Sequence, residues 1–326
     1  MKYFFLITLL LCSPALASYA GRPEVQAFVR DFAQRHGIVE SELKRVFAKT
    51  QRLEPVLEAI ARPAERVKPW DEYRALLITE RRIAEGVQFW KKYHQALARA
   101  EKRYGVPPQY VVAIIGVETF YGRNTGNWRV VDALTTLAFD YPPRAGFFKS
   151  ELESYLLMAR EAKVDVFSVR GSYAGAIGIP QFMPSSARRY AVDFDRNGHI
   201  DLQKSRWDAI GSVANFLKVH GWERDADVVV EARVSGDAWR DYLSTRFEPR
   251  HTMPELRRAG IDFDSPAPAG VSGALIELPN APERASEYRI GLKNFYVITR
   301  YNRSALYAAA VCDLANELRK GYDFGK

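Results

Sequence analysis

The stretch Val111–Gly122, VVAIIGVETFYG, carries one carboxylate, Glu118, at the end of an otherwise apolar run. If this stretch is helical, Glu118 shares a face with the apolar side chains three, four and seven residues earlier. An unpaired carboxylate on an apolar face is costly to ionise, so we expect its pKa to be raised. Such a group stays protonated near neutral pH, as a general acid must. The alternative is an ordinary glutamate at a helix end whose head group reaches water.

Length and composition indicate a globular protein with an export signal. The chain has 326 residues, of which 47% are hydrophobic and 26% are charged, and this size suits two or three lobes. Lys2, the apolar run Tyr3–Cys12 and the small-x-small site Ala15–Ala17 predict a signal peptide over residues 1–17 and a periplasmic location. Lipoprotein anchoring at Cys12 is the weaker alternative, because Leu11 stands where a small residue is needed.

Cysteine content and charge limit the partners of the mature chain. After cleavage at Ala17, Cys312 is the single remaining cysteine, so no intramolecular disulfide is expected. Removing Lys2 lowers the formal charge from +8 to +7, and a basic exported protein meets anionic polymers such as peptidoglycan. No nucleic acid is expected as a partner, because the chain lacks zinc-finger spacing, an RNP-type strand and a long Lys/Arg block.

Hydrophobic spacing predicts a mainly α chain with a β insertion. Apolar residues at three- and four-residue intervals predict helices through residues 18–104, among them a helix capped by Ser41 and one long helical stretch over Tyr73–Tyr104. Pro107 and Pro108 open the helix that carries Glu118. Three short strand-like runs follow, Val228–Val234, Gly273–Leu278 and Tyr288–Ile290, and they are separated by turns rich in Pro, Gly and Asp.

The segment 171–190, GSYAGAIGIPQFMPSSARRY, contains three glycines and two prolines. Regular structure is therefore expected only from Pro184 onward. A glycine-rich turn of this kind brings backbone amides and the ring of Phe182 close to a ligand. It lacks the Lys-Ser/Thr ending of a phosphate-binding loop.

The segment 193–208 follows the calcium-loop template of an EF-hand. Oxygen-bearing side chains occupy loop positions 1, 3, 5 and 9, and Gly198 occupies position 6. Lys204 replaces the bidentate Glu at position 12, and Asp208 is the nearest carboxylate that can take its place. The alternative is a loop of Asx turns without a metal ion.

Signatures of other hydrolases are missing from the sequence. It contains no Gly-x-Ser-x-Gly elbow and no His-Glu-x-x-His helix, and Cys312 is expected to be a small buried apolar residue. Glycoside cleavage usually calls for two carboxylates across the scissile bond. Asp132 and Asp140 are possible partners for Glu118, but nothing in the sequence selects either one.

Five segments closely resemble the membrane-bound lytic murein transglycosylase B family. They are GVETFYGRNTG at 116–126, the spacing of 133–143, the run GSYAGAIGIPQFMPSSARRYAVDFDRNGHIDL at 171–202, DAIGSVANFLKVHGW at 208–222 and LKNFYVITRYNRS at 292–304. The resemblance implies a mainly α (α+β) fold with a lysozyme-like catalytic core at 105–222, which includes the EF-hand-like loop 193–208. It also implies a helical domain at 18–104 that includes the C-terminal helix 304–326, a small β domain at 223–294, and a groove segment with a return helix at 295–326.

The same resemblance implies cleavage of the MurNAc-β-1,4-GlcNAc bond of peptidoglycan with formation of 1,6-anhydromuramic ends. Glu118 matches the family's single catalytic glutamate, which acts first as acid and then as base. The residues that match the sugar-binding set are Tyr73, Ser172, Gln181, Phe182, Tyr296, Tyr301 and Asn302. Those that match the ligands of a structural Ca²⁺ are Asp193, Asp195, Asn197, His199 through its carbonyl, and Asp208.

Three departures from the family pattern are visible, and none touches Glu118. Phe216 stands where a Tyr is found, Pro143 where an Arg is found, and the metal loop is one residue longer before Asp208.

A hydrolysing muramidase and a non-catalytic, calcium-stabilised peptidoglycan-binding protein are the alternative functions. We expect a monomer that binds glycan strands, with outer-membrane or cell-wall synthesis and division proteins as further partners.

Overall fold

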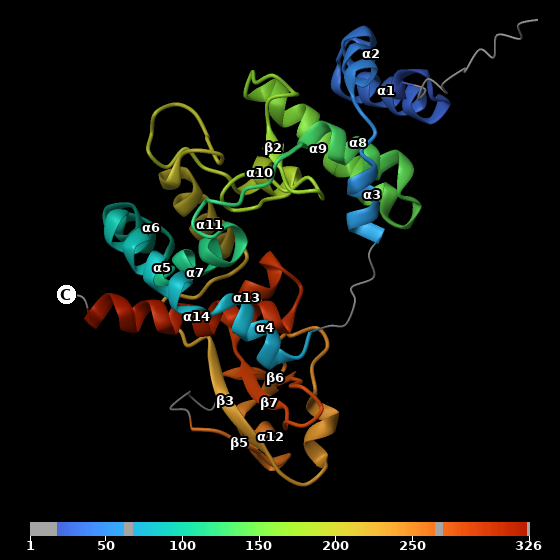
Figure 1. Cartoon of the computed structure of the whole chain (residues 1–326). Coiled ribbons are helices and arrows are strands. Elements are labelled where there is room, and N and C mark those ends of the chain that lie inside the picture. The colour runs from blue at the N-terminus through green and yellow to red at the C-terminus, as the bar shows by residue number, and fades with distance from the viewer. Residues whose placement is uncertain (1–17, 62–67, 265–269, 325–326) are drawn as a thin grey trace, which may run out of the picture.

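The computed structural model describes residues 18–61, 68–264 and 270–324 (Figure 1). The predicted signal peptide and Cys12 lie outside these residues. The helices of the described part are α1 (Pro23–His36), α2 (Glu40–Lys49), α3 (Glu54–Ala61), α4 (Trp70–Leu77), α5 (Glu80–Lys92), α6 (His94–Tyr104), α7 (Pro108–Thr119), α8 (Val130–Asp140), α9 (Ala145–Glu161), α10 (Pro184–Tyr190), α11 (Arg206–Val219), α12 (Met253–Arg258), α13 (Lys293–Tyr301) and α14 (Ala305–Phe324). The predicted mainly α fold with a small β part is therefore observed.

The strands form two antiparallel sheets. They are β1 (Trp128–Arg129), β2 (Arg170–Gly171), β3 (Val229–Val234), β4 (His251–Thr252), β5 (Ile261–Asp262), β6 (Ser272–Leu278) and β7 (Glu287–Gly291). β1 pairs with β2, and the other strands form one sheet in the order β4-β6-β7-β3-β5. The longer strands β3, β6 and β7 match the predicted runs. The two-residue strands β4 and β5 were not predicted, because they are too short to show alternation.

Three hydrophobic clusters hold the described chain together. The first surrounds α7 and includes buried residues of α4 to α6, α11, α13 and α14. The second joins α1, α2 and α3 to α8 and α9, and the third lies between the sheet and α12. Figure 1 shows α14 lying across the middle of the molecule, between the helices of the first cluster and the sheet.

The helices of residues 18–104 divide between two of these clusters. Phe28 and Phe47, from α1 and α2, pack edge-on against Phe139 of α8. In contrast, α4 and α5 pack against α14, and α6 packs against α7 and α11. The predicted domain boundaries stay a prediction, and the packing adds that α1 to α3 share a core with α8 and α9.

Two predicted helix features are wrong. The stretch Tyr73–Tyr104 is divided among three helices, not one. Thr79 begins α5 as its N-cap, accepting a hydrogen bond from the backbone amide of Arg82 at 3.1 Å. The backbone of Tyr93 leaves the helical conformation between α5 and α6. The two turns allow both α4 and α5 to pack against α14. The predicted cap at Ser41 is also wrong, since α2 begins at Glu40 after Val39 and has no side-chain cap bond.

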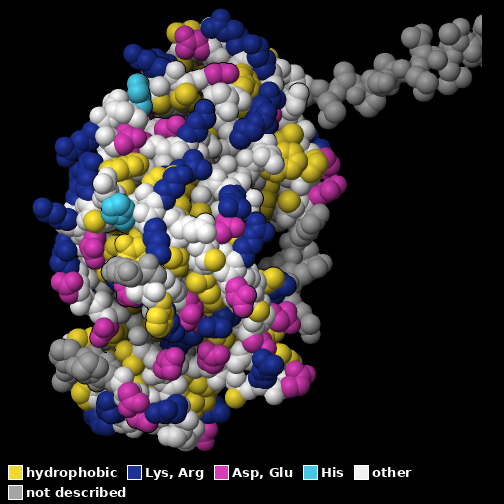
Figure 2. Space-filling model, turned by 60° about the vertical axis from the view of Figure 1, so that its left-hand side comes forward, with side chains coloured by type: hydrophobic (Ala, Val, Ile, Leu, Met, Phe, Trp, Pro, Cys, Tyr) yellow, Lys and Arg dark blue, Asp and Glu magenta, His cyan; other side chains and the backbone are white. Residues whose placement is uncertain are grey.

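The surface is basic without a single dominant block. Lys and Arg side chains are spread over the face shown in Figure 2, as the sequence predicted. None of the helices in the described residues is both long and apolar enough to cross a membrane.

Candidate active site

The helix α7 delivers Glu118 to the centre of the first cluster. Val111, Ile114 and Ile115 are fully buried, and the helix ends one residue after Glu118, where Phe120 takes a left-handed conformation with φ of 50°. The hydroxyl of Thr119 donates to the carbonyl of Ile179 at 2.9 Å. The helix end is therefore tied to the glycine-rich segment.

Among the described residues, the carboxyl group of Glu118 has one hydrogen-bond partner. The hydroxyl of Tyr307 on α14 donates to Oε1 of Glu118 at 2.6 Å. Glu118 keeps part of its surface accessible to solvent, but the protein around it raises the pKa of its carboxyl to about 7, and the Tyr307 bond partly offsets this rise. No acidic side chain contributes to this shift. The raised pKa agrees with the expectation from the sequence.

Three tyrosines surround Glu118. Burial, followed by the charge of Glu118, raises the pKa of Tyr73 on α4, of Tyr301 on α13 and of Tyr307. The sequence predicted the first two and missed Tyr307. Its signal was a hydroxyl within the apolar start of the C-terminal helix, since a buried hydroxyl needs a hydrogen-bond partner.

The glycine-rich segment forms a wall beside these tyrosines. Its backbone folds back on itself through a bridge between Ile177 and Phe182. The hydroxyl of Tyr301 donates to the carbonyl of Pro180 at 2.5 Å, which connects the wall to α13. Phe182 is only 2% exposed and packs against Phe216 and Tyr301, with ring centroids 5.6 Å apart in both pairs. Its ring therefore supports the wall from behind.

Ser172 and Gln181 stabilise the backbone of this wall. Oγ of Ser172 accepts from the amide of Ala176 at 3.0 Å. Gln181 takes a left-handed conformation with φ of 50°, and its side-chain amide donates to the carbonyls of Gly178 and Thr125. Residues other than glycine seldom adopt this left-handed backbone conformation, and the two hydrogen bonds of its side chain hold Gln181 in it.

The other two predicted sugar-binding residues lie along α13. Tyr296 is half-buried beneath the guanidinium of Arg300, which lies 4.3 Å from the ring centroid. Asn302 is exposed at the C-terminal end of the helix. Within the described residues, no direct contact joins either side chain to Glu118.

Asp132 and Asp140 are engaged elsewhere. Asp132 forms an ion pair with Arg129 at 2.5 Å and accepts from the backbone amide of Gln51. Asp140 pairs with Arg22 at 2.7 Å. Both hold the second cluster together, and neither is a partner carboxylate for Glu118.

A second group of acidic side chains lies in the loop 193–208. Carboxylate oxygens of Asp193, Asp195 and Asp208 lie within 4.8 Å of one another. Three carboxylates this close repel one another unless a cation is bound, and oxygen ligands of this kind fit Ca²⁺. Asn197 belongs to the same turn, where its side chain accepts from the amide of His199 at 2.8 Å.

Asp208 holds the two ends of this loop together. It is fully buried, and its carboxylate accepts from the backbone amides of Phe194 and Asp201, both at 2.8 Å. Ser205, which the sequence reading missed, caps α11 by accepting from the amide of Asp208 and donates to Asp195 at 3.0 Å. The third carboxylate of this group thus comes from the first turn of α11.

The loop is coupled to the wall beside Glu118. The amide of Ile179 donates to the carbonyl of Leu202 at 2.8 Å. Gly178 has φ of +68°, and a Cβ at this position would lie 2.3 Å from that carbonyl oxygen. Only glycine permits this approach.

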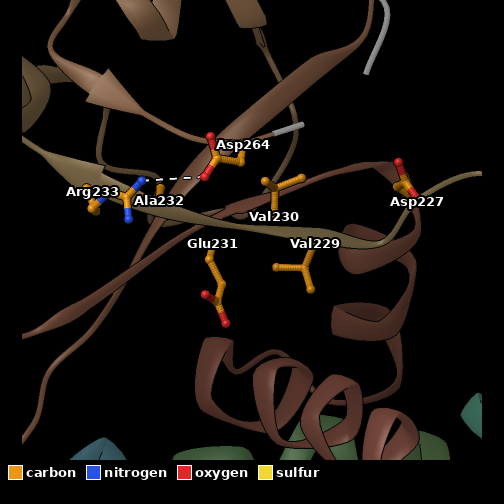
Figure 3. Close-up of a pocket in the computed structure, with 7 residues that line it drawn as sticks. All are labelled: Asp227, Val229, Val230, Glu231, Ala232, Arg233 and Asp264. Carbon is orange, nitrogen blue, oxygen red and sulfur yellow. Dashed lines mark ion pairs between the residues drawn. The ribbon is translucent and has the colours of Figure 1, made fainter. Parts of the chain in front are cut away.

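A hollow of about 480 Å³ lies on the sheet, away from these groups. Figure 3 shows Val229 and Glu231 on one side of β3 and Val230 on the other, as strand geometry requires. Arg233 pairs with Asp264 at 3.5 Å. Because its polar groups point in different directions, we assign no site to it.

Known proteins resemble the chain over most of its length. A family model described as a transglycosylase SLT domain matches residues 20–316. The chain belongs to the transglycosylase SLT family. A relative in this family, the membrane-bound lytic murein transglycosylase B of Escherichia coli (strain K12), is 41% identical over 308 residues, which are 91% of this chain and 82% of the relative.

Solved structures of the family have the same fold. The soluble lytic transglycosylase SltB1 from Pseudomonas aeruginosa is 48% identical with a TM-score of 0.87, covering 92% of this chain and 99% of that one. The E. coli lytic transglycosylase Slt35 in complex with calcium is 41% identical with a TM-score of 0.82, covering 93% and 95%. SltB3 from P. aeruginosa in complex with NAG-NAM-pentapeptide is 31% identical with a TM-score of 0.80, covering 91% and 79%. These matches confirm the predicted family and fold class.

Proposed function

We propose that this member of the family is a peptidoglycan lytic transglycosylase that cleaves the MurNAc-β-1,4-GlcNAc bond and leaves 1,6-anhydromuramic ends. The observation that carries the proposal is Glu118, whose carboxyl has a raised pKa of about 7 and no acidic hydrogen-bond partner among the described residues. The glycan-peptide complex of SltB3 and the names of the other relatives support the same substrate class.

A single residue, Glu118, supplies both the protonated and the ionised carboxyl that the reaction needs. Protonated Glu118 gives its proton to the glycosidic oxygen as the bond to C1 breaks. The resulting carboxylate then takes a proton from the C6 hydroxyl of the muramoyl sugar, and that oxygen bonds to C1. Glu118 ends the cycle protonated again, and no water is consumed. Tyr307 holds the carboxyl in place and stabilises its ionised form.

Under the same proposal, the predicted sugar-binding residues have different roles. Tyr73 and Tyr301 face Glu118, while Ser172 and Gln181 shape the wall whose backbone borders the sugar. Phe182 acts by supporting that wall. Tyr296 on α13 and Asn302 at the C-terminal end of this helix serve further sugar units.

The metal loop supplies rigidity in this proposal. Asp193, Asp195, Asn197, the carbonyl of His199 and Asp208 hold one Ca²⁺ ion, which neutralises the converging carboxylates. The calcium complex of Slt35 supports this assignment. Through the bond between Ile179 and Leu202, a rigid loop keeps the wall beside Glu118 in position.

Location and assembly complete the proposal. The relative from E. coli is membrane-bound, and its substrate lies in the cell wall. We propose export to the periplasm as a monomer, directed by a signal peptide at residues 1–17, which lie outside the described residues.

Analysis of products from purified sacculi tests the proposal. The wild type is expected to release muropeptides lighter by one water than those of a hydrolase, and Glu118→Gln is expected to release none. Reducing-end products would overturn the proposal in favour of a muramidase. Binding of sacculi by both proteins without release from either would indicate a non-catalytic binding protein.

A further inference from the structure

Arginine side chains gather around a second hollow, at the face of α13 that carries Tyr296. This hollow, the arginine pocket, has a volume of about 410 Å³. Its lining includes Arg246, Glu248, Arg250, Tyr296, Arg300 and Arg303. Four arginines and one glutamate give it a formal charge of +3.

Most of this charge is not balanced within the described chain. Arg250 pairs with Glu248 at 2.5 Å. Arg246, Arg300 and Arg303 have no ion-pair partner among the described residues, although many other arginines of the chain are paired. Guanidinium groups that share one hollow repel one another, so an anion bound between them would be stabilised.

Two contacts position the guanidinium of Arg300. Its guanidinium stacks over the ring of Tyr296 at 4.3 Å, and one of its nitrogens donates to the hydroxyl of Thr299 at 2.9 Å. Its Nε is buried without a hydrogen-bond partner. The ring stacking and the bond to Thr299 therefore fix the side chain, while its remaining guanidinium N–H groups are free of ion pairs in the described chain.

The pocket and the groups around Glu118 share the helix α13. Arg300 precedes Tyr301, whose ring centroid is 6.5 Å from that of Tyr307, the direct partner of Glu118. A glycan bound beside Glu118 therefore has α13 as a neighbour. Arginine forks match carboxylates and phosphates. On a peptidoglycan strand the anionic groups are the carboxylates of the peptide stems.

We propose that the arginine pocket binds a carboxylate of the peptide stem carried by the glycan strand. The inference rests on the proposed function, because it takes peptidoglycan as the substrate. A fully extended stem of five residues spans at most about 18 Å, so a stem attached to a sugar beside Glu118 can extend along α13. The pocket thus makes the enzyme selective for strands that retain their stems.

Binding of a disaccharide-pentapeptide fragment tests this proposal in the full chain with Glu118→Gln, which prevents turnover. The fragment is compared, by calorimetry, with the same fragment whose stem carboxylates are capped as amides. We expect the free acid to bind about tenfold more tightly, as one charge-assisted contact provides. That preference should disappear when Arg246→Gln and Arg303→Gln are added.

The matched control replaces Arg30 and Arg45 with Gln. Both are exposed arginines without an ion pair in the described chain, so the charge change is the same, and the preference should persist. Melting temperatures check that each variant is folded. Equal affinity for free and capped fragments, no detectable binding of either, or a preference that survives the pocket substitutions would overturn the proposal.

Two further outcomes separate this proposal from the proposed function. A carboxylate-dependent preference in a protein whose wild type yields no anhydro products would support the pocket while the proposed function fails. Anhydro products without such a preference would leave the function standing and remove the pocket. Binding to anionic lipid vesicles that only the pocket substitutions abolish, without any effect of capping, would assign the pocket to phosphate and also overturn the stem proposal.

Discussion

Replacing Glu118 with Gln should make stability depend on pH in a specific way. The substitution removes the ionisable group and keeps an oxygen that can accept from Tyr307. The pKa of Glu118 is raised from an ordinary 4.5 to about 7 in the folded protein. The folded state therefore binds this proton more tightly than the unfolded state, so the wild type loses stability as the pH rises from about 4.5 to 7.

The expected size follows from the two pKa values. A difference of about 2.5 corresponds to about 3 kcal/mol, at 1.36 kcal/mol for each tenfold change. Near pH 4, where Glu118 is protonated in both states, the variant and the wild type should have similar free energies of unfolding. Above pH 8 the variant should be more stable by about 3 kcal/mol.

Denaturant unfolding of both proteins at a series of pH values measures this difference. Glu72→Gln is the matched control, because it makes the same substitution at an exposed glutamate of α4 without an ion pair in the described chain. A flat difference for Glu118→Gln, or one that grows toward acid pH, would refute the argument that burial keeps Glu118 protonated.

Three further predictions concern the surroundings of Glu118. Tyr307→Phe removes a bond that lowers the pKa of Glu118, so the alkaline limb of the pH profile of kcat should move up by about one pH unit, and an unmoved limb would contradict this. Removal of calcium with EDTA should lower the melting temperature of the wild type. The free energy of unfolding should fall by about 2.7 kcal/mol if free calcium was at 100 times its Kd. Asp195→Asn should abolish this response to EDTA. Gly178→Ala should destabilise the protein by about 3 kcal/mol or more, because the new Cβ would lie 2.3 Å from a carbonyl oxygen. The control is Gly236→Ala, where φ is +67° but the space around the Cβ is open, and it should cost about 1 kcal/mol. Denaturant unfolding measures both changes.

Local pattern was enough to predict several elements. The helix that ends just after Glu118, the start of α10 at Pro184 and the strands β3, β6 and β7 all match their predicted positions. These features depend on proline geometry, apolar spacing and alternation, which act over a few residues. Local pattern failed at the three-helix stretch α4 to α6, because the breaks at Thr79 and Tyr93 interrupt a sequence whose apolar spacing is helical throughout.

The sequence by itself determined that Glu118 lies at the end of an apolar helix and that oxygen-bearing side chains occupy calcium-loop positions in the segment 193–208. Only the tertiary structure decided that Tyr307 is the partner of Glu118, that α1 to α3 pack on α8 and α9, and that Phe182 faces the core. The physical reason is that these contacts join segments far apart in the chain. Glu118 and Tyr307 are separated by 189 residues, and no periodicity within either helix specifies which hydroxyl will meet the carboxylate.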